Sequence, residues 1–192
     1  MQGWRKRQED SHITDLDLGP SNQTQLFAVF DGHGGSEVAK FVANHFTEEF
    51  LKNKNYLRND IKKALEENYQ KMDSLMLEKE GREELLSEYQ KSKEEASKIK
   101  ENNKNAQIEM LRQVIDPKEQ PDAKISMFTG CTANVLVIQE NKLFFANAGD
   151  SRSVICKKGK AIPMSIDHKP TIPAELKRTE KAGGCVSDGR VL

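Results

Sequence analysis

The stretch LFAVFDGHGG, residues 26–35, decides the fold of this chain. Its first five residues are apolar, and an unbroken apolar run predicts a strand buried on both faces, because a half-buried strand would alternate with polar residues. The strand stops at Asp31, and the glycines that follow allow backbone with positive φ. A carboxylate at the end of a buried strand indicates either a functional site or an ordinary turn, in which Asp and Gly are common.

The composition is that of a polar globular protein. The chain has 192 residues, 36% hydrophobic and 31% charged, with a formal net charge of zero. This length fits one domain with a moderate core, or most of a larger one. The absence of a basic block argues against a nucleic-acid partner, and no apolar run is long enough to insert into a membrane. The three widely spaced cysteines predict reduced, structural thiols and a cytoplasmic or nuclear protein.

The first half of the chain predicts a hairpin followed by helices. Residues 13–18 alternate between apolar and polar, which predicts a half-buried strand that pairs with residues 26–30. Ser36 is a suitable N-cap for a helix with one apolar face over residues 38–50. The same spacing continues over residues 56–76 and predicts a second helix, for which an antiparallel arrangement with the first is one option.

Residues 77–105 are dense in Lys and Glu and carry only a thin apolar stripe. A coiled-coil partner site is one interpretation, but the apolar pattern does not persist over enough heptads to favour it. We therefore expect a solvated helix or a mobile insertion. A short amphipathic patch follows at residues 108–115.

The second half changes to the periodicity of strands. Three runs joined by tight connections predict an antiparallel meander, with another short strand at 162–166. Pro173 is well placed to begin a helix, and Gly183 lies where that helix would end. The last residues, 185–192, begin another strand-like alternation. The three runs are residues 131–138, 143–148 and 153–156.

Carboxylates lie at or beside the strand ends, at Glu9, Asp10, Asp31 and Asp150. Taken singly, each is more readily explained as a turn residue or a surface charge. If adjacent strands bring them together, their negative charge needs a cation, and oxygen ligands favour Mg²⁺ or Mn²⁺ over zinc. Arg5, close to the first two, is the kind of residue that binds phosphate with two hydrogen bonds.

Several of these stretches resemble, in order, the motifs of the metal-dependent protein phosphatases of type 2C. The resemblance covers nearly the whole chain outside the Lys/Glu-rich segment. The set of motifs in order is far more specific than any one of them. The motifs are MQGWRKRQEDSH, FAVFDGHGG, GCTANVLVI, FFANAGDSRSV, DHKP and EKAGGCV.

This resemblance implies an α+β fold, a β-sandwich of mainly antiparallel sheets flanked by helix pairs in four α-β-β-α layers. It also implies a site with two Mg²⁺ or Mn²⁺ ions. Asp31 is similar in position to the carboxylate that bridges the metals, and Gly32 to the residue whose carbonyl binds one of them. Glu9 resembles the ligand of the other metal, and Asp10 its acidic neighbour.

The remaining site residues are also implied by the resemblance. Arg5 matches the phosphate-binding arginine, and His33 the histidine proposed as general acid. Asp150 resembles an aspartate of a further, weaker metal site. We expect His168 in DHKP, and likewise His12 and His45, to be structural.

In the family that this chain resembles, the pattern continues beyond its last residue: Asp188 to Leu192 look like the first residues of a further segment, and two more metal-binding aspartates follow that segment. We therefore expect residues 1–192 to form an incomplete catalytic domain with an insertion at about 77–105. The implied function is the hydrolysis of phosphoserine and phosphothreonine in protein substrates by a metal-activated water, with weak or no activity in this chain alone. The alternative is a non-catalytic, phosphatase-like binding or regulatory protein. The oligomeric state is not predicted.

Overall fold

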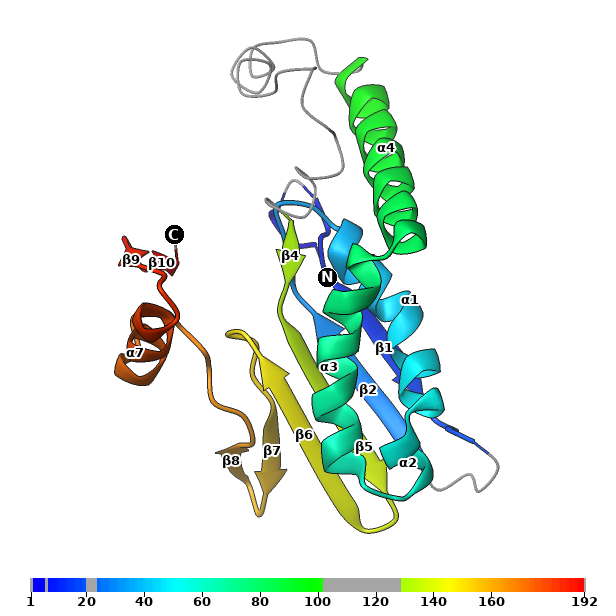
Figure 1. Cartoon of the computed structure of the whole chain (residues 1–192), viewed down its shortest axis with the longest axis vertical. Helices are drawn as coiled ribbons and strands as arrows, with labels where there is room; N and C mark the ends of the chain where they lie inside the picture. Colours follow the sequence, from blue (N-terminus) through cyan, green and yellow to red (C-terminus); the bar gives the residue numbers. More distant parts are fainter. Residues whose placement is uncertain (1, 6, 20–23, 102–128, 192) are drawn as a thin grey trace.

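A four-stranded antiparallel sheet lies at the centre of the protein (Figure 1). The computed structural model describes residues 2–5, 7–19, 24–101 and 129–191, the side chains of 95–101 excepted. The strand order is β1-β2-β5-β6, so the first hairpin and the later hairpin are joined by pairing between β2 and β5. The strands are β1 (Ser11–Asp15), β2 (Thr24–Phe30), β5 (Ala133–Gln139) and β6 (Lys142–Ala148).

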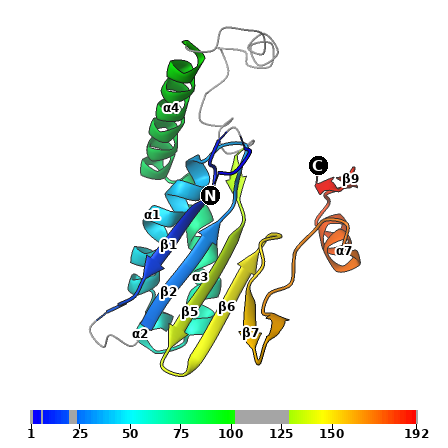
Figure 2. The ribbon, with the colours of Figure 1, turned by 180° about the vertical axis from the view of Figure 1, so that it is seen from behind.

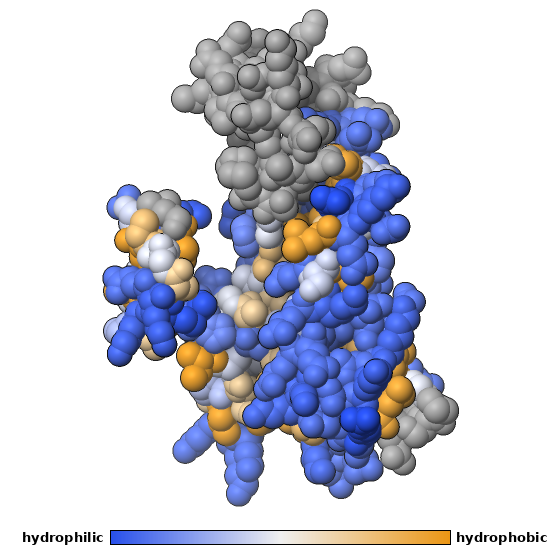
Figure 3. Space-filling view, viewed as in Figure 1, coloured by the Kyte–Doolittle hydropathy of each residue, from blue (hydrophilic) through white to orange (hydrophobic). Residues whose placement is uncertain are grey.

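Helices cover one face of this sheet (Figures 1 and 2). The face is set by the alternation of β2, in which Leu26, Ala28 and Phe30 are buried. Most of the solvent-facing surface of the helical layer is hydrophilic (Figure 3), as expected for amphipathic helices that bury a single stripe. The helices are α1 (Glu37–Lys52), α2 (Lys54–Leu57), α3 (Ile61–Leu77) and α4 (Lys79–Glu101).

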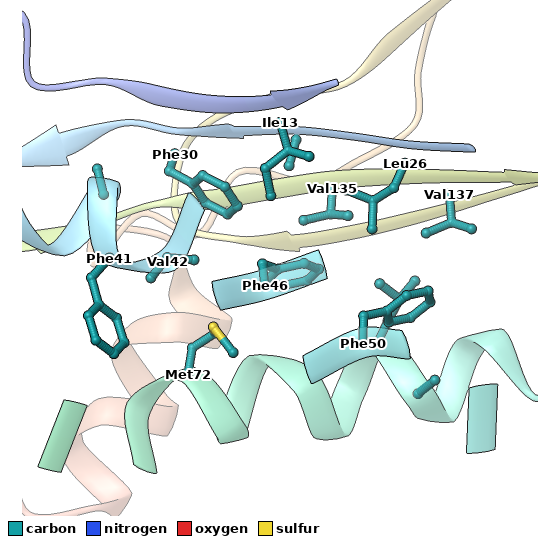
Figure 4. Close-up of a cluster of buried hydrophobic side chains, with 14 of the residues drawn as sticks. Ile13, Leu26, Phe30, Phe41, Val42, Phe46, Phe50, Met72, Val135 and Val137 are labelled. Carbon is teal, nitrogen blue, oxygen red and sulfur yellow. The ribbon is translucent and has the colours of Figure 1, made fainter. Parts of the chain in front are cut away.

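The hydrophobic core lies between the sheet and α1 and α3 (Figure 4). Phe46 of α1 is 1% exposed and packs its ring 5.9 Å from that of Phe30 and 5.8 Å from that of Tyr69. Tyr69 also donates its hydroxyl to the carbonyls of Ala133 and Ala146, on β5 and β6. The core therefore joins both helices to three strands of the sheet.

The other face of the sheet corrects the prediction that residues 26–30 are buried on both faces. Val29 is 51% exposed and Phe27 is half-buried. The helices occupy only one side, and the described part of the chain places no second layer over the other (Figure 2). The apolar run correctly predicts a strand. Burial of its second face would require a second layer of secondary structure packed against that face.

The helix predicted over residues 56–76 is in fact broken into two. Asn53 caps α2 by accepting a hydrogen bond from the backbone N–H of Asn55. Asn59 then adopts φ of 64°, which ends α2, and Asp60 caps α3 by accepting from the N–H of Lys63. The correction follows from local capping, because Asn and Asp favour caps and left-handed backbone over helix interiors.

The Lys/Glu-rich segment begins as a long helix, α4, that is anchored to the core. Leu85 is 4% exposed within the core, and Leu86 and Tyr89 pack beside it. Glu84 and Glu88 pair with His45 and Lys40 of α1, at 2.7 and 3.4 Å. The thin apolar stripe therefore packs against the domain over this part of α4. The patch predicted at 108–115 lies outside the described residues.

The C-terminal part forms short hairpins and one helix. The predicted meander is right for β5 and β6 but wrong for its third strand, because β7 pairs with β8 in a separate two-stranded sheet. The helix predicted from Pro173 is confirmed as α7, with Pro in its first turn. The C-terminal elements are β7 (Val154–Lys157) paired with β8 (Lys160–Pro163), α7 (Pro173–Lys181), and β9 (Val186–Ser187) paired with β10 (Arg190–Val191). Earlier in the chain, β3 (Gly32–His33) pairs with β4 (Gly130–Cys131).

All three cysteines are free thiols, with Cys131 half-buried and Cys156 and Cys185 exposed. Burial raises the pKa of the Cys131 thiol to about 11, which keeps it neutral at physiological pH. Among the helices that the structure describes, none combines the length and the apolar character needed to cross a bilayer.

Leu26 provides a test of the core. Leu26 is 0% exposed whereas Leu57 is 72% exposed, so the same change can be made at a buried and an exposed leucine. We expect Leu26→Ala to lower the free energy of unfolding by about 2–5 kcal/mol, through lost burial and the cavity left behind. Leu57→Ala should change it by less than about 0.5 kcal/mol. Chemical denaturation measures both, and equal losses would contradict this placement of the core.

Candidate active site

A pocket of about 1130 Å³ lies where β2 ends. The N-terminal segment reaches the same end of the sheet as β4 (Figure 1). Five further segments of the chain complete the wall, so residues far apart in sequence share one cavity. Every site residue expected from the sequence lines this pocket: Arg5, Glu9, Asp10, Asp31, Gly32, His33 and Asp150.

Asp31 is held at the pocket by two hydrogen bonds with Thr132, the residue between β4 and β5. The N–H of Thr132 donates to the carbonyl of Asp31 at 2.9 Å. In return, the N–H of Asp31 donates to the Thr132 hydroxyl at 3.4 Å. Because the preceding residue, Phe30, is fully buried in the core, the position of Asp31 is fixed from both sides.

Gly32 permits a close approach between the N-terminal segment and the DGHGG loop. A Cβ atom on Gly32 would overlap the backbone carbonyl of Glu9. Any other residue here would push Glu9 and Asp10 away from Asp31. The glycine is therefore required by packing within the site, independently of the role that its own carbonyl could have.

Asp150 reaches the pocket from the loop after β6. The preceding Gly149 has φ of 105°, and a Cβ there would overlap the side chain of Thr132. The Thr132 hydroxyl also lies 2.6 Å from that of Ser151. Thr132 thus contacts both the segment that carries Asp31 and the loop that carries Asp150.

The carboxylates repel one another. The pKa of Asp31 is raised, chiefly by burial, then by the negative charges of Asp10 and Asp150 and by a hydrogen bond with the Asp10 side chain. The nearby His33 opposes the rise. Bringing these groups together therefore has an electrostatic cost in the folded protein.

This donor set fits a hard divalent cation in its chemistry, since a positive charge would offset the repulsion and all the side-chain donors are carboxylate oxygens. Among the described residues, however, no group of three His, Cys, Asp or Glu side chains is placed to hold a metal ion. Mg²⁺ commonly uses one or two carboxylates and several waters, so a pair such as Asp10 and Asp31 is a reasonable starting set. The carboxylates are therefore the right type of ligand for such an ion, but they do not complete its coordination shell.

Sequence reasoning missed several residues of the pocket wall. His168, which we expected to be structural, lines the pocket together with Lys169. Thr132 does so as well, and its signal was available in the GCTA motif, where a hydroxyl interrupts an apolar strand. Arg7 and Arg190 add positive charge, but nothing in their local sequence distinguishes them from surface arginines.

Comparison with known proteins identifies the family of this chain. The family model for protein phosphatase 2C matches residues 1–88 and 50–192. Protein phosphatase 2C 1 of Paramecium tetraurelia is 44% identical over 191 residues, covering 100% of this chain and 53% of that protein. Probable protein phosphatase 2C 21 of Arabidopsis thaliana is 38% identical over 195 residues, with 100% and 54% covered. The chain belongs to the protein phosphatase 2C family, and it spans about half the length of these curated relatives.

Solved structures show the same fold. A Caenorhabditis elegans sex-determining protein matches with a TM-score of 0.60 at 22% identity, over 98% of this chain and 38% of that one. The serine-threonine phosphatase 2C of Toxoplasma gondii matches with a TM-score of 0.54 at 20% identity, over 95% and 52%. The α+β class with antiparallel sheets and packed helices is therefore confirmed.

The raised pKa of Asp31 predicts how stability changes with pH. A carboxyl with a higher pKa in the folded state stabilises the fold while it is protonated, and that contribution is lost as pH rises through the folded-state pKa. Without divalent ions, Asp31→Asn should therefore raise the melting temperature at pH 7. The gain should disappear below the ordinary pKa of aspartate, where the wild-type residue is protonated in both states.

Asp17→Asn is the matched control, because Asp17 is exposed and lies outside the pocket. Thermal denaturation followed by circular dichroism at several pH values measures the difference. An Asp31→Asn gain of the same size at low and neutral pH would show that ionisation is not its cause.

Proposed function

We propose that this protein hydrolyses phosphoserine and phosphothreonine in other proteins, with Mg²⁺ or Mn²⁺ bound in the pocket. One observation carries the proposal: the expected phosphate-binding, acid–base and metal-binding residues line a single cavity. Membership of the protein phosphatase 2C family supports the reaction type. Reduced thiols are consistent with action in the cytoplasm or nucleus.

The metal-binding roles fall to the acidic residues and one carbonyl. Asp31 would be shared between two ions, and the Gly32 carbonyl and Glu9 would each bind one, with Asp10 in support. Asp150 would serve a further, weaker ion. When bound, such ions lower the pKa of a coordinated water and neutralise charge on the phosphoryl group.

The other roles belong to the cationic side chains. Arg5 would hold the phosphate, since its planar guanidinium can donate two parallel hydrogen bonds to phosphate oxygens. A turn in which the N–H of Arg5 donates to the Gln2 carbonyl at 3.2 Å sets its backbone beside the pocket. His33 would give a proton to the serine or threonine oxygen as that oxygen leaves phosphorus and the oxygen of the attacking water bonds to phosphorus in its place. Its place on β3, paired with Gly130, fixes the backbone from which the ring extends.

A second candidate is a non-catalytic protein that binds phosphoproteins through the same pocket. The observation in its favour is that no three side-chain ligands converge for a metal among the described residues. The same observation leads us to expect weak turnover from this chain alone. Experiment can distinguish the two functions, because binding of a phosphopeptide and release of its phosphate are measured independently.

The test is release of phosphate from phosphoserine or phosphothreonine peptides, with and without Mn²⁺. We expect Mn²⁺-dependent release that EDTA abolishes. Arg5→Ala should lower kcat/KM by about 10- to 100-fold, the loss expected for a charged hydrogen bond to phosphate. Arg58→Ala is the control, because Arg58 is exposed and does not line the pocket.

Two results would contradict the enzyme assignment. Peptide binding that depends on Arg5, with no phosphate released at any Mn²⁺ concentration, would favour the binding protein. Equal effects of the Arg5 and Arg58 substitutions would remove the phosphate-binding role of Arg5.

A further inference from the structure

The DHKP motif has no role in the function proposed above, yet its residues lie at the pocket. His168, Lys169 and Pro170 all line the cavity. The motif follows the β7–β8 hairpin and runs beside the loop after β6, which carries Asp150. Its hydrogen bonds and ion pair with that loop indicate the role of the motif at the pocket.

An ion pair and a reciprocal pair of hydrogen bonds join the two segments. Arg152 donates to Asp167 twice, from Nε to Oδ1 at 2.9 Å and from Nη2 to Oδ2 at 2.8 Å. The N–H of His168 donates to the Gly149 carbonyl at 2.8 Å, and the N–H of Gly149 donates to His168 Nδ1 at 3.4 Å. We call the four residues Gly149, Arg152, Asp167 and His168 the clamp.

The clamp encloses Asp150. Gly149 precedes Asp150 directly, and Arg152 lies two positions after it. Further along, the N–H of Ser153 donates to the Ser165 hydroxyl at 2.9 Å, which continues the connection between the same two segments. The backbone on both sides of Asp150 is thereby tied to the DHKP segment.

Electrostatics explain why Asp150 needs this restraint. Asp150 is itself exposed, and its charge is one of those that raise the pKa of Asp31. The adjacent Gly149 gives the loop conformational freedom. Repulsion would move an unrestrained Asp150 away from Asp31, so an acidic residue can stay near the cluster only if its backbone is held.

The geometry of the ion pair suits it for positioning more than for stability. The Asp167 side chain is 11% exposed, which fixes its orientation, whereas that of Arg152 is 56% exposed. An ion pair with one partner exposed to solvent, as Arg152 is here, contributes little to the free energy of folding. A double hydrogen bond between guanidinium and carboxylate, however, fixes direction as well as distance.

We propose that Asp167 and Arg152 are positioning residues that hold Asp150 at the metal-binding pocket. The inference rests on the proposed function, because it assigns Asp150 to a bound divalent ion. It adds a role for the DHKP motif, in which Asp167 acts through the loop at residues 149–152 and itself touches neither metal nor substrate.

The test is the affinity of the whole chain for Mn²⁺, measured by calorimetry and by the electron paramagnetic resonance signal of free Mn²⁺. Asp167→Asn and Arg152→Gln should each weaken the affected site by at least about tenfold, as is usual when the support of a metal ligand is removed. The melting temperature in EDTA should change by less than about 4 °C, because the Arg152 side of the pair is largely exposed to solvent, which screens the ion pair. A merely structural role would lower the melting temperature and leave the affinity unchanged.

Arg152→Lys keeps the charge but cannot form the double hydrogen bond, so it should restore little of the affinity lost in Arg152→Gln. Glu175→Gln is the matched control. Its partner Arg178 donates to Glu175 at 2.8 and 3.1 Å on α7, and neither residue lines the pocket. Glu175→Gln should leave Mn²⁺ affinity unchanged.

Asp150→Asn decides whether the clamp acts through Asp150. In that background, Asp167→Asn should have no further effect on Mn²⁺ affinity, because the residue that it positions has already lost its charge. Additive losses in the double variant would overturn the proposal. If Asp167→Asn does not fold, Arg152→Gln provides the same comparison.

The outcomes also separate the two proposals. Wild-type chain that binds no Mn²⁺ would overturn the metal-dependent function and the clamp with it. Wild-type chain that binds Mn²⁺ with unchanged affinity in both clamp variants would overturn the clamp alone.

Discussion

The pairing of β2 with β5 is the constraint on which the rest of the structure depends. It joins segments about a hundred residues apart, and the contact between Asp31 and Thr132 at its end spans 101 positions. On the inner face, this pairing sets Leu26 and Ala28 opposite Val137 and Val135, beneath the helices. The same register brings the DGHGG loop to the GCTA segment. Core and pocket are therefore two consequences of one strand alignment.

Residue type along the chain predicted the main elements and the carboxylates and Arg5 of the pocket, whereas Gly32 and His33 were expected only from the family resemblance. The apolar run before Asp31 identified the central strand, and the repeated arrangement at Asp150 identified the second strand end. The predictions that were wrong concern features that depend on tertiary contacts or on local capping, which residue type alone does not specify. Burial of Val29 requires a second layer, the break at Asn59 depends on capping, and the partner of β7 is set by the chain that follows it. His168 was assigned to structure because nothing local distinguishes a pocket histidine from a buried one.

The core and the pocket contribute to the free energy of folding with opposite signs. The core gains free energy by removing rings such as Phe46 from water, whereas the pocket brings together carboxylates that repel. A site of this kind is held in place by the fold around it. Thr132 is central to that support, because it bonds to Asp31 on one side and contacts Ser151 on the other. The Arg152–Asp167 pair extends the same support outward to the surface.

The helix α4 has a consequence for how the molecule moves in solution. It contains 23 residues and is thus about 35 Å long, and the anchors among its described side chains, Leu85, Leu86 and Tyr89, lie in its first half. The rest of the helix extends beyond the end of the sheet (Figure 1). Rotational diffusion of such a body is anisotropic, with slower tumbling of the long axis. We therefore expect the described part of the chain to tumble with a larger effective radius than a sphere of the same mass.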